Sequence, residues 1–92
     1  MDKKMIEEIE KWLKNLEERK VEIVQEGFMT SKICIENLKY EIQYDNLNLK
    51  DKEKDIYISF NLNQVYEIQM QNNILIFYLD NDIKIKIVNS KK

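Results

Sequence analysis

The sequence predicts an α+β domain in which an N-terminal amphipathic helix packs on a strongly bent antiparallel β-meander. Apolar residues recur at helical spacing only near the start of the chain. From residue 21 onward, short segments of alternating apolar and polar residues are separated by clusters of Asn and Asp, which is typical of strands joined by tight turns. An unbroken apolar run, Ile74 to Leu79, lies between two such clusters. These observations are compatible with a small barrel and with an open curled sheet.

The helix is predicted over residues 3–19. Its apolar residues share one face of a helix with about 3.6 residues per turn. Asp2 is placed to cap the N-terminus, and Arg19 and Lys20 suit the negative end of the helix dipole. Because the apolar stripe is narrow, this helix can cover one surface of a sheet but cannot wrap around it. The stripe consists of Met5, Ile6, Ile9, Trp12, Leu13 and Leu16.

The apolar run from Ile74 to Leu79 is predicted to be the central strand. Successive side chains of a strand point to opposite faces, so one face receives Leu75, Phe77 and Leu79. The other face receives Ile74, Ile76 and Tyr78. We expect both faces to be shielded from water, which a single helix cannot achieve. The run therefore predicts either a closed barrel or a partner chain that covers the second face.

The other strands are predicted between residues 21 and 88, and one of them contains an irregularity. The apolar positions are odd-numbered before Glu36-Asn37 and even-numbered after it. A strand cannot change face without an extra residue, so this pair is a bulge or a tight turn, and we favour a bulge within one long bent strand. Gly27 is a candidate bulge or turn. The segment from Asp51 to Asp55 is predicted to be a charged loop.

The composition is that of one globular domain spanning residues 1–92. The chain is 43% hydrophobic and 35% charged, and its formal net charge is -2. This balance lacks the strong basic excess of a typical nucleic-acid binder. We see no signal-peptide segment and no apolar run of the roughly 20 residues that a membrane helix needs. We therefore expect a cytoplasmic protein that does not bind membranes.

Few residues offer catalytic chemistry. The chain has no histidine and one glycine, so the commonest general base and glycine-rich phosphate loops are excluded. Cys34 lies in a predicted strand and is interpreted as an ordinary thiol. Asp80 and Asp82 could bind a hard cation, but turn preference explains them more simply. We expect no enzyme activity, no cofactor and no metal, and no motif places the chain in a family.

RNA binding by a small barrel of the Sm or SH3 type is the alternative function. A helix followed by bent antiparallel strands is the outline of small barrels of the Sm or SH3 type, and it is also compatible with a pleckstrin-homology-like sandwich. Tyr57 could stack on a base. Lys84, Lys86, Lys91 and Lys92 cluster near the C-terminus and could bind phosphate. A second group, Lys50, Lys52 and Lys54, is interleaved by Asp51, Glu53 and Asp55, which are expected to cancel much of its field.

The favoured function is a non-catalytic protein-binding module, and a homodimer is one form of that interaction. The residue usage favours A/T-rich codons, which suggests a phage or mobile-element protein. Such a protein could inhibit a host defence enzyme of the CRISPR type by docking on it. A polar outer strand surface suits recognition of a protein. The predicted partner-binding residues are Tyr57, Glu67, Gln69, Asp80, Asp82, Lys84 and Lys86.

Overall fold

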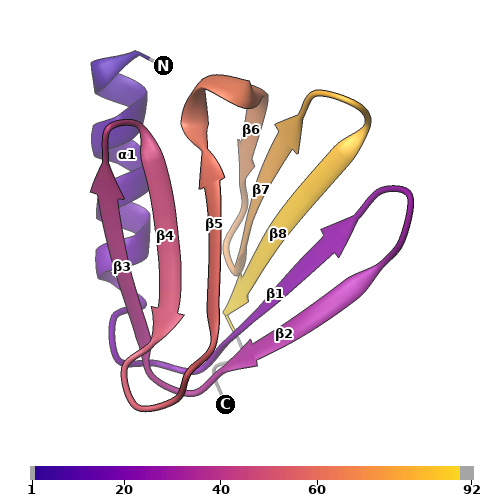
Figure 1. The fold of residues 1–92 in the computed structure, drawn as a ribbon. Coiled ribbons are helices and arrows are strands. Elements are labelled where there is room, and N and C mark those ends of the chain that lie inside the picture. The colour runs from indigo at the N-terminus through magenta and orange to yellow at the C-terminus, as the bar shows by residue number, and fades with distance from the viewer. Residues whose placement is uncertain (1, 90–92) are drawn as a thin grey trace.

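The computed structural model describes residues 2–89, which form one N-terminal helix and two antiparallel sheets (Figure 1). Lys91 and Lys92 lie outside the described residues. Helix α1 spans Lys3–Lys14. The strands are β1 (Val21–Glu26), β2 (Ser31–Ile35), β3 (Leu38–Gln43), β4 (Asn46–Asp51), β5 (Tyr57–Asn61), β6 (Val65–Met70), β7 (Ile74–Leu79) and β8 (Ile83–Asn89), and a short 3-10 helix, η1 (Leu62–Gln64), precedes β6.

The strands form a five-stranded sheet with the order β2-β1-β8-β7-β6 and a three-stranded sheet with the order β3-β4-β5. Each pairing joins two strands that are neighbours in sequence, except that of β1 with β8, in which Ile23 lies opposite Ile87. The two sheets do not close into a barrel. The predicted α+β class is therefore confirmed in its open, curled form.

Helix α1 ends at Lys14, five residues before the predicted end at Arg19. Asp2 caps its N-terminus as expected, because the Asp2 side chain accepts a hydrogen bond from the Lys4 N–H at 3.1 Å. The helix ends here because the backbone that follows it forms hydrogen bonds with Leu38 at the start of β3. The Glu18 N–H donates to the Leu38 carbonyl at 2.8 Å, and the Leu38 N–H donates to the Arg19 carbonyl at 3.1 Å. Glu18 reaches this position with a φ of 63°.

The core lies between the two sheets and the helix. Leu75 and Phe77 of β7 are fully buried, and so are Ile9 and Leu13 of α1. The rings of Phe77 and of Phe60 from the three-stranded sheet form an edge-to-face contact, with their centroids 5.0 Å apart. The face of β7 that carries Leu75 and Phe77 therefore lies in the core, where the helix and the other sheet cover it.

The second face of β7 is not enclosed by a closed barrel, which corrects one of the two outcomes predicted from the apolar run, and cover by a partner chain stays a prediction. Ile76 points away from the core, yet it is only 8% exposed. Its cross-strand neighbours on that face are Lys86 of β8 and Gln69 of β6. Long polar side chains of this kind can lie with their aliphatic stems along an apolar neighbour. One strand can therefore be apolar throughout while only one of its faces lies in the core.

The change of face at Glu36-Asn37 is a bend between sheets and not a bulge within one strand. The bend carries the chain from β2 into β3, which belongs to the other sheet. Asp51 holds it in place: the Glu36 N–H donates to Asp51 Oδ2 and the Glu53 N–H donates to Asp51 Oδ1, each at 2.9 Å. Asp51 is only 4% exposed, so it does not belong to a solvated charged loop as predicted. The two backbone donors, led by Glu53, hold the pKa of Asp51 below its ordinary value.

Candidate partner-binding surface

Four of the predicted partner-binding residues lie together on the solvent side of the five-stranded sheet. Glu67 and Gln69 of β6 share this side with Lys84 and Lys86 of β8, and Tyr78 of β7 lies between the two strands. We call this side the outer face. It is made by Glu22, Val24 and Glu26 of β1, Lys32 and Cys34 of β2, Glu67 and Gln69 of β6, Ile74, Ile76 and Tyr78 of β7, and Lys84, Lys86 and Val88 of β8.

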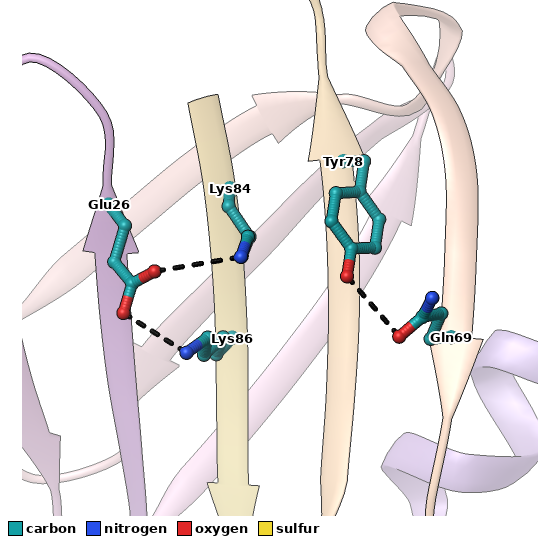
Figure 2. A network of polar contacts seen from close by, with 5 residues as sticks. All are labelled: Glu26, Gln69, Tyr78, Lys84 and Lys86. Carbon is teal, nitrogen blue, oxygen red and sulfur yellow. Dashed lines mark hydrogen bonds and ion pairs between the residues drawn. The ribbon is translucent and has the colours of Figure 1, made fainter. Parts of the chain in front are cut away.

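Glu26 joins two of these lysines. Its two carboxylate oxygens face β8 separately: Lys86 Nζ donates to Oε2 at 3.0 Å, and Lys84 Nζ lies 3.8 Å from Oε1 (Figure 2). The hydrogen bond from Lys86 lowers the pKa of Glu26, and the charges of both lysines act in the same direction. The carboxylate of Glu26 is therefore held in its charged form between two cations.

Tyr78 continues the network towards β6. Its hydroxyl donates to Gln69 Oε1 at 3.2 Å (Figure 2), and Gln69 Nε2 donates to Glu67 Oε2 at 3.3 Å. Lys84 Nζ lies 5.4 Å from the centroid of the Tyr78 ring, within the range of a cation–π contact. The Tyr66 ring lies on the other side, with its centroid 6.3 Å from that of Tyr78. A continuous chain of polar contacts thus crosses β1, β8, β7 and β6.

The charges of the outer face balance. It carries three lysines, Lys32, Lys84 and Lys86, and three glutamates, Glu22, Glu26 and Glu67. Each of these lysines has a carboxylate within ion-pair distance, since Lys32 Nζ lies 3.7 Å from Glu22 Oε2. A balanced and internally paired surface does not attract a phosphate backbone, whose binding requires basic side chains free to neutralise it.

The predicted residues Asp80 and Asp82 lie at the rim of the outer face, in the turn between β7 and β8. This turn packs against the loop between β1 and β2, since a Cβ placed on Gly27 would lie 3.3 Å from Ile83 Cγ1 and 3.8 Å from the Asp82 carbonyl oxygen. Gly27 therefore permits a close approach of the two hairpin ends. Figure 1 shows both connections at the same end of the molecule.

The loop between β1 and β2 carries two exposed apolar side chains next to each other. Phe28 is 102% exposed and Met29 is 73% exposed. They line a hollow of about 500 Å³, together with Asn81 of the β7–β8 turn and Ile83 at the start of β8. Phe28 was not among the partner-binding residues predicted from the sequence. The sequence does mark this loop as a place for exposed apolar side chains, because Phe28 and Met29 lie between Gly27 and the small polar pair Thr30-Ser31.

Tyr57 does not belong to this surface. It lies on β5 in the three-stranded sheet, on the side that faces away from the core. Cys34 is exposed on β2, opposite Glu22. Within residues 2–89, Asp80 and Asp82 are not part of any group of three or more side chains that could hold a metal ion. The described helix is too short to cross a membrane.

Comparisons of the chain with protein-family models, with curated proteins and with solved structures each found no match.

Proposed function

We propose that the chain is a non-catalytic protein-binding module whose partner contacts the outer face and the neighbouring β1–β2 loop. The observation that carries this proposal is the complete exposure of Phe28 beside Met29 at the end of a hairpin. Burying a large apolar side chain of this kind contributes roughly 1.5 to 3 kcal/mol. Two such side chains on one loop can therefore anchor a protein–protein interface.

The outer face supplies the surroundings that such an anchor needs. Protein interfaces combine a buried apolar or aromatic centre with polar groups around it. Tyr66 of β6 and Tyr78 of β7 provide aromatic surface on the sheet, Glu26 and Lys84 orient each other, and Gln69 is held by Tyr78. Side chains held in one arrangement before binding lose less conformational entropy when the partner arrives. The surface therefore suits a partner with an apolar pocket bordered by polar groups.

The test is capture of the partner by the purified chain from lysate of the cells in which it functions, after nuclease treatment. Replacing both Phe28 and Met29 by Ser should abolish capture, while the variant remains folded because both side chains lie in solvent. Tyr44→Ser is the matched control, since it also removes an exposed aromatic group but lies in the turn between β3 and β4 of the other sheet. Equal capture by the double Ser variant and the unchanged chain would refute the proposal.

The same experiment addresses the finer predictions made from the sequence. Identification of the captured protein by mass spectrometry tests whether it is a nucleic-acid enzyme of host defence. Light scattering on the purified chain tests the homodimer, in which a second copy of the chain would be the partner. A dimer that dissociates in the double Ser variant would place Phe28 and Met29 at the interface between copies.

A further inference from the structure

The three-stranded sheet also has a side that faces away from the core, and its charges are arranged differently. The register aligns Lys39 of β3 opposite Lys50 of β4, and Lys50 opposite Tyr57 of β5. We call these three residues the Lys–Lys–Tyr row. Directly opposite side chains in an antiparallel pair have Cβ atoms about 4.5 to 5.5 Å apart, and like charges in that position repel. The sheet thus carries an unfavourable cation pair beside an aromatic ring.

Neither lysine of the row has a carboxylate within ion-pair distance among residues 2–89, whereas Lys32, Lys52, Lys84 and Lys86 each have one. Asp51 was expected from the sequence to cancel the charge of Lys50. Instead, Asp51 points inward and accepts hydrogen bonds from two backbone N–H groups. The positive field of the row is therefore open to an anion from solvent.

Three glutamates lie near the row without pairing with it. Glu41 lines the same hollow as Lys39 and Lys50. Glu17 and Glu18 line a smaller adjacent hollow with Lys39, and the Glu18 carboxylate is held by Lys52 at 3.2 Å. These acids surround one end of the row, so the end formed by Lys50 and Tyr57 is the better place for a negatively charged group.

The row borders a hollow of about 310 Å³ that contains the groups needed to hold a base and a phosphate. Its walls are Lys39, Tyr40, Glu41, Asn48, Lys50 and Tyr57. The Tyr57 side chain is 62% exposed, so its ring is accessible for stacking. Asn48 carries an amide that can both donate and accept hydrogen bonds.

From this arrangement we propose that the Lys–Lys–Tyr row binds a nucleotide unit. The base stacks on Tyr57, and the phosphate is bound by Lys50 with Lys39 beside it. The row spans two strand spacings, about 9.6 Å, which suits one base with its neighbouring phosphate and not a long tract. The unit can come from a free nucleotide or from a single-stranded nucleic acid, and both sources share this chemistry. This site is separate from the proposed protein-binding surface.

The proposal is tested by titrating the isotope-labelled chain and following its backbone amide signals by NMR. The three probes are inorganic phosphate, ADP and a single-stranded octamer of thymidylate. We expect saturable shifts at residues 39–41, 48–50 and 57–59 with ADP or with the octamer. Tighter binding of the octamer would identify the single strand as the source, and equal binding would identify the free nucleotide. The proposal is overturned by an absence of saturable shifts, by shifts elsewhere, or by equal shifts with phosphate alone.

Variants and salt sharpen the test. Tyr57→Ala and Lys50→Gln should each weaken binding of the responding probe about tenfold. The control Lys11→Gln removes the same charge from an exposed position on α1 and should leave binding unchanged. For the octamer, neutralisation of one phosphate predicts a loss of about 2.6-fold between 50 and 200 mM salt, and a smaller loss in Lys50→Gln. Equal weakening by Lys11→Gln and Lys50→Gln would mean that only the net charge matters, which would overturn the site.

Discussion

The backbone N–H of Glu36 donates a hydrogen bond to Asp51 Oδ2 at 2.9 Å and so ties the bend between the two sheets to the end of β4. The other carboxylate oxygen of Asp51 receives the Glu53 N–H at the same distance. The backbone adds a further link, because the Lys52 N–H donates to the Asn37 carbonyl at 2.8 Å. One buried carboxylate thus orients both the bend and the turn that leads to β5.

Asp51→Asn should lower the melting temperature at neutral pH, because an amide offers one acceptor oxygen where the carboxylate offers two. The folded pKa of Asp51 lies below its ordinary value of 3.8, so its contribution to stability is fully present above that value. The contribution is lost as the pH falls through the folded pKa. Thermal melts between pH 7 and pH 2 should therefore show the two proteins converging in acid.

The matched control is Asp55→Asn, which removes an exposed carboxylate from the same turn. It should leave the melting temperature nearly unchanged across the same pH range. If Asp51→Asn were as stable as the unchanged protein at pH 7, the carboxylate would not be holding the bend.

Phe77→Ala should destabilise the fold by about 3 to 5 kcal/mol, because the ring is fully buried against Phe60 and its removal leaves a cavity. This loss is a large fraction of the roughly 5 to 15 kcal/mol that holds a small domain together. Urea unfolding measures it directly. Phe28→Ala removes the same ring from solvent and should change stability by less than about 0.5 kcal/mol. Similar effects of the two substitutions would contradict the assignment of β7 to the core.

Tyr44→Asn should stabilise the protein by about 1 kcal/mol. Tyr44 and Asp45 form the two-residue connection between β3 and β4 with φ values of 53° and 65°, a conformation in which Asn is favoured and a bulky residue is strained. Tyr44 is 86% exposed, so little packing is lost. Tyr57→Asn, at a strand position, should give no such gain. A lower melting temperature for Tyr44→Asn would mean that the Tyr44 ring makes stabilising contacts.

Local patterns predicted those parts of the fold that depend on neighbouring residues in sequence. The apolar run from Ile74 to Leu79 identified β7, although it did not show which of its faces lies in the core, and Asp2 was recognised as a helix cap. The end of α1 was missed because it depends on pairing between Glu18 and Leu38, twenty residues apart. The inward position of Asp51 was missed for the same reason, since its backbone donor Glu36 lies in the bend between β2 and β3, 15 residues away in sequence.

In the candidate surfaces too, features that depend on neighbouring residues in sequence were predicted, and those that depend on strand pairing were not. Alternation placed Lys84 and Lys86 on one face of a strand, which the structure confirms. It could not show that Glu26 lies beside them, because this requires the pairing of the first strand with the last. Lys39 was not considered, because its position opposite Lys50 follows only from the register of β3 and β4.

The proposed protein-binding role is tested most directly by replacing Phe28 with a photo-crosslinking phenylalanine analogue in the cells where the chain functions. We expect a discrete crosslinked protein when the analogue is at position 28. We expect none when the same analogue replaces Glu8, which is exposed on α1. The adduct should form in nuclease-treated samples, and an excess of the unmodified chain should reduce its yield. An absence of any adduct at position 28, or the same adducts at both positions, would contradict the claim that this loop anchors a protein partner.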